Sequence, residues 1–311
     1  MTTPSSTKAS DSPLVTVVIP TRGRPALLVR AIESVLLQTM NDLEVIVVID
    51  GEDGGTVTAI QSISSPQVRH LQLPNQLGGS RARNEGVHAA LGYWVAFLDD
   101  DDEWLPEKLE KQLAAARSSQ SSDPIVGSKV MARTSAGEFV WPRKLPTEPL
   151  SEYLLARNSW SQGEGLLQTS TLITTRRLLL QIGFLEGLKK HQDWDWLLRA
   201  IRMPGAKIEF VPEPLAVWHL EQSHDSVSRK QDWRGSLNWI RERRSLVTRR
   251  AYAGFIATQI ASQASRQGHW RAFVPLLAEM FQKGSPKPID LCLLLGMWLV
   301  PIPLRERLRS L

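Results

Sequence analysis

Four consecutive aspartates, Asp99–Asp102, are the group most able to do chemistry. They directly follow an apolar run at 93–98, and carboxylates this close repel one another unless a cation lies among them. Hard oxygen ligands of this kind select Mg²⁺ or Mn²⁺. The alternative is a solvated acidic loop that stabilises the start of a helix at Pro106. An EF-hand is excluded because Trp104 occupies the position that requires glycine. The preceding apolar strand favours a metal site.

Asp50 ends a second apolar run and is followed by Gly51. Its carboxylate could accept hydrogen bonds from a nucleobase or a ribose, or it could start an ordinary Asp-Gly turn. The residues alone favour neither interpretation. A dinucleotide site would need three spaced glycines after the first strand. The segment 21–25 contains one glycine, which makes that class of site a poor match.

A third group is Asp193 and Asp195, which flank Trp194. The indole could form a sugar-stacking wall or raise the pKa of a neighbouring carboxyl. The plainer interpretation makes Asp193 the N-cap of a helix and places the tryptophan in the core. His219 follows the last predicted strand, where it could be a metal ligand or a phosphate contact, although a single histidine is more often neither.

The periodicity of the first hundred residues predicts the elements that position these groups. Short apolar, β-branched runs predict strands covered on both faces, and the segments between them have helical spacing. The strands are predicted at 14–19, 44–49, 68–73 and 93–98, and the helices at 25–38, 56–63 and 80–90, the last capped by Ser80. This order predicts an α/β fold with an open, mostly parallel sheet. Thr21, Arg22, Asp50 and the aspartates would share the edge where ligands bind such sheets.

After residue 120 the pattern is looser. We predict a charged helix at 106–118, strands at 124–133, 138–141, 169–174, 207–211 and 215–218, helices at 175–182 and 193–202, and helical structure from 231 to 283. This gives three regions: a disordered N-terminus (1–13), an α/β domain (14–230) and a helical C-terminal extension (231–311).

Composition sets the broad class. The chain of 311 residues is 42% hydrophobic and 22% charged, which is ordinary for a globular protein. We interpret the net charge of +5 as a solvated surface with a basic bias, not as a nucleic-acid site. The single cysteine, Cys292, allows no intrachain disulfide. Without a signal-like segment or an apolar run of 18 residues, we expect a cytoplasmic protein.

Several separate motifs resemble family 2 glycosyltransferases of the GT-A fold. They are Val17–Arg24, Ile49-Asp-Gly51, Asn75 with Ala82-Arg-Asn84, Phe97–Asp102 with Pro106, Gln192–Asp195, and Trp218 to Ser228. Their order and spacing over about 14–230 make the resemblance specific. Two departures are Gln192, where the family usually has glutamate, and Gly23, where it commonly has asparagine.

The resemblance implies roles for individual residues. Asp193 stands at the position of the catalytic base. Asp101 stands at the metal-ligand position of the DxD motif, with His219 as a weaker second candidate, and the acceptor wall would include Trp194 and Asp195. The nucleotide-sugar site would be formed by Pro20, Thr21, Arg22, Asp50, Arg83, Asp99 and Asp100.

The function implied is an inverting, metal-dependent transfer of a sugar from a nucleotide-diphospho-sugar, with a UDP-sugar favoured, to a glycan or lipid-linked hydroxyl. Mn²⁺ or Mg²⁺ would be the cofactor. One alternative is a catalytically inactive nucleotide-sugar-binding or scaffold protein in a glycan assembly pathway. A sugar-1-phosphate nucleotidyltransferase would need a glycine-rich loop after the first strand, which this sequence does not have.

The segment 289–311 is strongly apolar over 291–300 and then contains Arg305, Arg307 and Arg309. At about ten residues the apolar part is too short to span a bilayer, which needs about 20. It could lie at a membrane surface with its arginines on anionic lipid. A core helix or a dimer contact explains the same residues equally well.

Overall fold

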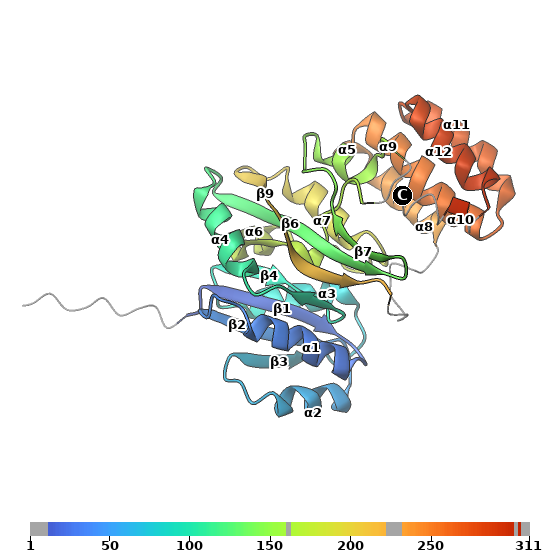
Figure 1. The fold of residues 1–311 in the computed structure, drawn as a ribbon. Coiled ribbons are helices and arrows are strands. Elements are labelled where there is room, and N and C mark those ends of the chain that lie inside the picture. Colours follow the sequence, from blue (N-terminus) through green and yellow to red (C-terminus); the bar gives the residue numbers. More distant parts are fainter. Residues whose placement is uncertain (1–11, 160–162, 222–231, 302–303, 306–311) are drawn as a thin grey trace, which may run out of the picture.

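The computed structural model describes residues 12–159, 163–221, 232–301 and 304–305. Its centre is one sheet, in the order β3-β2-β1-β4-β8-β6-β9-β5, with β7 paired to β6 (Figure 1). The strands are β1 (Val15–Thr21), β2 (Leu43–Ile49), β3 (Val68–Gln72), β4 (Trp94–Phe97), β5 (Asp102–Trp104), β6 (Asp123–Thr134), β7 (Gly137–Trp141), β8 (Ile173–Thr175) and β9 (Ala206–His219).

The first four strands are parallel, as the βαβ pattern predicts, and β6 and β9 form a further parallel pair. β8 joins the two halves by pairing antiparallel with both β4 and β6. Alternate residues of β1 point into different cores. Val18 packs with one cluster and Val17 and Ile19 with the other, so the strand is buried on both faces. The predicted α/β fold with a mostly parallel sheet flanked by helices is therefore confirmed.

Helices cover both faces. One core contains apolar residues of α1 (Pro25–Leu36), α2 (Gly54–Ser62) and α4 (Lys108–Ser118). The other contains residues of α3 (Gly79–Ala89), α5 (Leu150–Leu155), α6 (Arg176–Gln181) and α7 (Gln192–Ala200).

The second core continues without a break into the C-terminal helices, which gather at one end of the molecule beyond α5 and α7 (Figure 1). They are α8 (Trp233–Glu242), η3 (Arg244–Leu246), α9 (Arg249–Phe255), the π-helical turn η4 (Ile256–Ile260), α10 (Ala261–Arg266), η5 (Trp270–Ala272), α11 (Phe273–Lys283) and α12 (Pro288–Leu299). Within the described residues, no helix has the length and apolarity needed to cross a bilayer. The predicted boundary at residue 230 stays a prediction, and the predicted disorder of 1–13 falls mostly outside the described residues.

Three sequence-based element predictions are wrong in detail. The strand predicted at 169–174 is a 3-10 turn, η1 (Thr169–Thr171), followed by the short β8. The two strands predicted at 207–211 and 215–218 form the single β9, which keeps its pairing with β6 through an irregularity beside Lys129. Ser80 does not cap α3, because the N-cap is Gly78 and the Ser80 hydroxyl is buried without a partner.

Gly86 sets the distance between α3 and the sheet. A Cβ at this position would lie 2.3 Å from a methyl of Val18, whereas a Cβ at Gly54, in α2, would have no neighbour within 4 Å. We therefore expect Gly86→Ala to destabilise the fold by about 1–3 kcal/mol through overpacking. Gly54→Ala should be neutral or slightly stabilising. Urea unfolding of both variants measures the difference, and equal midpoints would contradict this account of the packing.

Candidate active site

The β1–α1 loop and the aspartate run meet at the carboxyl edge of the sheet. Thr21, the last residue of β1, donates a hydrogen bond of 2.7 Å from Oγ1 to Asp100 Oδ2. Arg24 Nη1 lies 3.2 Å from Asp100 Oδ1 and 3.0 Å from Asp101 Oδ2. Arg30 of α1 donates to the main-chain oxygen of Asp101 over 2.9 Å. One guanidinium therefore offsets part of the charge of two neighbouring carboxylates.

The four aspartates have different surroundings. Burial raises the pKa of Asp100 to about 6, against the lowering effects of Thr21 and Arg24. Burial also raises the pKa of Asp101, and the charge of Asp99 adds to this. Asp102 is fully buried, which raises its pKa well above its usual range, and it accepts hydrogen bonds from Gln168 and Ser170. Asp102 thus connects the aspartate run to the segment that contains Gln168 and Ser170, below the surface of the site.

Asp50 fixes the start of α3. Its two oxygens accept hydrogen bonds from the main-chain nitrogens of Leu77, at 2.7 Å, and Gly78, at 3.0 Å. These contacts hold the start of another helix and are not those of a local Asp-Gly turn, although Gly51 has a φ of +103° that favours glycine. The predicted part of Asp50 in nucleotide binding stays a prediction. Asp53 has a similar role for the β1–α1 loop, because it caps α2 and accepts 2.7 Å from the nitrogen of Gly23.

Pro20 precedes Thr21 in β1, and Arg22 follows it on the β1–α1 loop. Pro20 is half-buried at the end of β1, and Arg22 is exposed. The structure thus places both at the same edge as Asp50 and Asp100, and their predicted part in nucleotide binding stays a prediction.

Arg83 of α3 connects this edge to the second half of the domain. Its guanidinium pairs with Asp99 through Nη2 and donates to Gln192 Oε1 through Nη1 over 2.9 Å. The next residue, Asn84, exchanges two hydrogen bonds with the main chain of Phe184, at 2.9 and 2.8 Å. Adjacent residues of one helix therefore fix the segment leading to α7. Gly79 leaves space for the Arg83 guanidinium, since a Cβ at position 79 would lie 3.0 Å from it.

Asp193 lies in the first turn of α7, half-buried. Burial raises its pKa to about 6, while the main-chain nitrogen of Trp194 and the charge of Arg83 oppose this. The helix begins at Gln192, with His191 as N-cap in the left-handed conformation at a φ of +63°. Asp193 is therefore not the N-cap that the plainer interpretation predicts, and its carboxylate is available for other chemistry.

His191 is packed among aromatic rings. Its ring stacks on Trp194 at a centroid distance of 5.2 Å and lies 4.8 Å from the Trp239 ring of α8. Burial lowers its pKa to about 3, so the imidazole is neutral. Its Nε2 lies 2.9 Å from the Ser236 hydroxyl. These contacts offset the energetic cost of the left-handed backbone conformation of His191, which is unusual for a residue other than glycine.

The structure corrects the prediction for Asp195. Its carboxylate is fully buried and faces away from Asp193, toward α8. It pairs with Arg199 at 2.7 Å and Arg243 at 2.5 Å, and accepts from the indole of Trp239 at 3.1 Å. A carboxylate so fully occupied has no atom left for an acceptor sugar, so its role is structural. Trp194 is only half-buried, and its predicted place in the acceptor wall stays a prediction.

His219 lies between two carboxylates, and its predicted role as a metal ligand stays a prediction. Its Nε2 lies 2.6 Å from Glu103 and its Nδ1 lies 3.0 Å from Glu221, which takes both ring nitrogens. Within the described residues, no group of three or more His, Cys, Asp or Glu side chains could hold a metal ion. The half-buried carboxylates of Asp99 and Asp101 fit a different arrangement, in which phosphate oxygens of a substrate complete the shell of a hard cation.

Reasoning from the sequence missed Arg24, Asp53 and Asn84 as residues that hold this site together. Arg24 could have been found from its position, because it stands on the first loop at the same edge as the aspartates. Asn84 stands in a motif that carries the resemblance, although no role was assigned to it. Asp53 gave no such signal, since it acts on a main-chain group of another segment.

Comparison with known proteins agrees with this geometry. A family model described as Glycosyl transferase family 2 matches residues 16–182, which is more than half of the chain. The amylovoran biosynthesis glycosyltransferase AmsB of Erwinia amylovora is 27% identical over 241 residues, covering 75% of this chain and 79% of AmsB. The putative colanic acid biosynthesis glycosyl transferase WcaA of Escherichia coli is 25% identical over 280 residues, covering 86% and 94%.

Among solved structures, the crystal structure of S. aureus TarS 1–349 in complex with UDP-GlcNAc matches with a TM-score of 0.56 at 17% identity. The match covers 91% of this chain and 79% of TarS. At this identity the likeness to TarS shows the fold alone. The family assignment comes from the matching family model. The chain belongs to glycosyltransferase family 2 and is a glycosyltransferase of the GT-A fold.

Proposed function

We propose that this glycosyltransferase moves a sugar from a nucleotide-diphospho-sugar to an acceptor hydroxyl with inversion at the anomeric carbon. The observation that carries the proposal is the double contact of Arg83. It joins Asp99, on the edge that would bind the donor, to Gln192, beside Asp193. The proposed proton acceptor and the acidic edge are thus held close together by one guanidinium, and this proximity supports a direct displacement between donor and acceptor.

The chemistry needs one step. The acceptor oxygen attacks the anomeric carbon as the bond from that carbon to the diphosphate oxygen breaks, and the nucleoside diphosphate leaves with the electron pair. Asp193 takes the hydroxyl proton as general base. Its pKa of about 6 suits this role, because the carboxylate is ionised at neutral pH yet basic enough to accept a proton. The roles of Pro20, Thr21, Arg22, Asp50 and Asp100 in holding the nucleotide belong to the same proposal.

A divalent cation, Mg²⁺ or Mn²⁺, fits the proposal. Asp101, with Asp99 beside it, would hold the ion, and when bound it would neutralise charge on the departing diphosphate. Burial raises the pKa of Asp101, and the charge of Asp99 adds to this. A cation between the two carboxylates would relieve the second, repulsive part, which supports this assignment.

The donor and acceptor classes rest on relatives. UDP-GlcNAc is bound to the structurally similar TarS, which supports a UDP-sugar as donor. AmsB, WcaA and the succinoglycan biosynthesis protein ExoO of Rhizobium meliloti are named for polysaccharide biosynthesis, which supports a glycan or lipid-linked acceptor.

Peripheral contact with a membrane through 289–311 is part of the proposal. α12 packs into the core through Leu294 and Met297, as the core-helix interpretation requires. Its outer face nevertheless leaves Leu295 and Leu299 exposed, at 44% and 72%. This face could rest on lipid while the helix stays packed.

We expect Asp193→Asn to lower turnover by roughly 10²–10⁴-fold, because the amide cannot accept the proton. Donor affinity should be unchanged. UDP release from a panel of UDP-sugars with oligosaccharide acceptors measures turnover, and calorimetry measures donor binding. Asp42→Asn, at an exposed aspartate, is the matched control. Turnover at the wild-type rate in Asp193→Asn would rule out this base. Donor binding by a wild-type chain without turnover would favour the scaffold alternative.

The same residue predicts the pH profile. A base with a raised pKa is lost by protonation as the pH falls, so kcat/KM should decline below about pH 6. Asp100, whose pKa is also raised to about 6 by burial, would add a second proton to this decline. A profile that stays flat down to pH 4.5 would contradict the role of Asp193.

Metal-dependent donor binding should depend on Asp101. We expect a UDP-sugar to bind more tightly with Mn²⁺ than with a chelator, and Asp101→Ala to remove that difference. Asp42→Ala should leave it intact. If Asp101→Ala retains the full effect of Mn²⁺, the ion is bound elsewhere or not at all.

Flotation with vesicles of phosphatidylglycerol and phosphatidylcholine tests the membrane contact. The variant Leu295→Ser/Leu299→Ser should float less than the wild type, because it removes exposed apolar surface without altering the core. Leu37→Ser, at a residue 71% exposed next to α1, is the control. Equal flotation of all three proteins would remove 289–311 from consideration as an anchor.

A further inference from the structure

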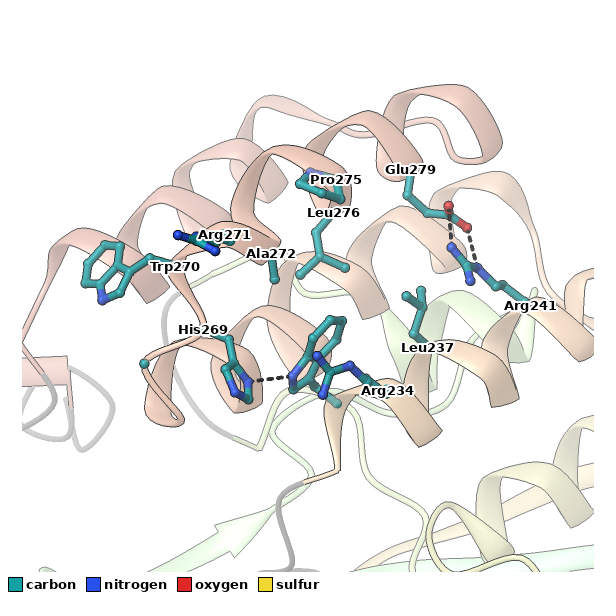
Figure 2. Close-up of a pocket in the computed structure, with 12 residues that line it drawn as sticks. Arg234, Leu237, Arg241, His269, Trp270, Arg271, Ala272, Pro275, Leu276 and Glu279 are labelled. Atoms are coloured by element: carbon teal, nitrogen blue, oxygen red, sulfur yellow. Dashed lines mark hydrogen bonds and ion pairs between the residues drawn. The ribbon is translucent and has the colours of Figure 1, made fainter.

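The C-terminal helices contain a cavity that the transfer reaction does not use. It has a volume of about 600 Å³, within the range of small-molecule sites. Figure 2 shows Arg234 and Leu237 of α8 on one wall and Ala272 and Leu276, from η5 and α11, on the other. α8 separates this cavity from Asp193, because its opposite face carries Ser236 and Trp239, which contact His191 and Asp195.

The cavity has an apolar floor. Leu237, Ala272 and Leu276 are buried in its walls, and Pro275 lines it as well. The indole of Trp233 closes one side and is held there by its own hydrogen bond of 2.9 Å to His269 Nδ1. A lining of this kind favours a hydrocarbon chain over a sugar or a nucleotide.

Three arginines, Arg234, Arg241 and Arg271, line the cavity. Arg234 and Arg271 are exposed at the cavity, and within the described part of the chain neither has a carboxylate partner. The Arg234 guanidinium rests over the Trp233 ring at 4.8 Å. Among the described residues that line the cavity, Glu279 is the one carboxylate, and it is paired with Arg241 and with Lys283, each at 2.9 Å. The excess charge in the cavity is therefore positive.

The whole C-terminal extension, 231–311, carries a net positive charge as well. Residues 231–311 contain thirteen Lys and Arg and five Asp and Glu, a net charge of +8, whereas the chain as a whole has +5. The remaining 230 residues therefore carry −3, so the basic character is concentrated in the extension and not spread over the protein. Trp270, Val274 and Phe281, exposed at 59%, 69% and 53%, add apolar groups on η5 and α11.

We propose that this cavity binds a phosphate-bearing lipid. The hydrocarbon chain would lie on the apolar floor, and the phosphate would be held between the guanidinium groups of Arg234 and Arg271. Charge complementarity selects an anionic headgroup, and the apolar floor requires a chain attached to it. Free phosphate would satisfy only the two arginines, and a neutral lipid only the floor.

The test uses the full-length chain and a lipid with chains short enough to stay monomeric. Dihexanoyl phosphatidic acid is titrated while tryptophan fluorescence is followed, with inorganic phosphate and dihexanoyl glycerol as the two partial ligands. We expect saturable binding of the phosphatidic acid only. Because a hydrogen bond to a charged group is worth about a tenfold change in affinity, Arg234→Gln/Arg271→Gln should bind at least roughly tenfold more weakly.

Two further variants separate the site from general charge and from misfolding. Arg117→Gln/Arg143→Gln removes the same charge from two exposed arginines of the α/β half and should bind like the wild type. Ala272→Phe places a ring in the cavity and should abolish lipid binding. Titration with a UDP-sugar and circular dichroism report whether each variant is folded, independently of turnover.

Three results would overturn the proposal. The first is binding of inorganic phosphate as tight as that of the lipid, which would mean a simple anion site. The second is equal weakening in both double variants, which would mean non-specific attraction of charge. The third is no saturable binding of phosphatidic acid by a folded wild-type chain.

Discussion

The site depends on the two contacts of the Arg83 guanidinium. Asp99 and Gln192 lie almost a hundred residues apart in the chain, and the side chain that joins them is largely buried. A guanidinium suits this task because its donors form a rigid fork that can reach two acceptors at once, which an ammonium cannot do with the same geometry. Since a charge buried without its partner is strongly destabilising, α3, the aspartate loop and the start of α7 must be correctly placed together. Gly86 adds the steric part of this constraint, because it brings α3 against Val18.

Electrostatic repulsion explains why four consecutive aspartates end up in different environments. Identical neighbours could not all remain ionised side by side. The chain resolves this by placing Asp102 inside, on Gln168 and Ser170, and by pairing Asp100 with Thr21 and Arg24. Asp99 and Asp101 remain partly exposed at the edge. The run that looks uniform in the sequence thus places Asp102 in a structural role and leaves the other three aspartates at the edge where a ligand would bind.

Sequence patterns predicted the features of the fold that depend on residues close together in the chain. The strands of the first half were predictable because each is a continuous apolar run, and a parallel sheet between two layers of helices requires such runs. The edge where Thr21, Asp50 and Asp99 gather followed from topology alone. Asp195 could not be assigned in this way, because its partner Arg243 directly follows α8 and lies 48 residues further along the chain. A carboxylate near the start of a helix looks the same in the sequence whether it faces a substrate or a buried arginine.

α8 gives the helical extension a part in the transferase site. Its Trp239 and the Arg243 that follows it supply two of the partners of Asp195, so the first turn of α7 rests on residues beyond position 230. Without them Asp195 would be a buried carboxylate with only Arg199 to offset its charge, and such a group destabilises the helix that carries it. Asp193 stands on that same turn. The extension is therefore not a separate attachment: the continuous core and the buried charge of Asp195 make the position of the proposed base depend on it.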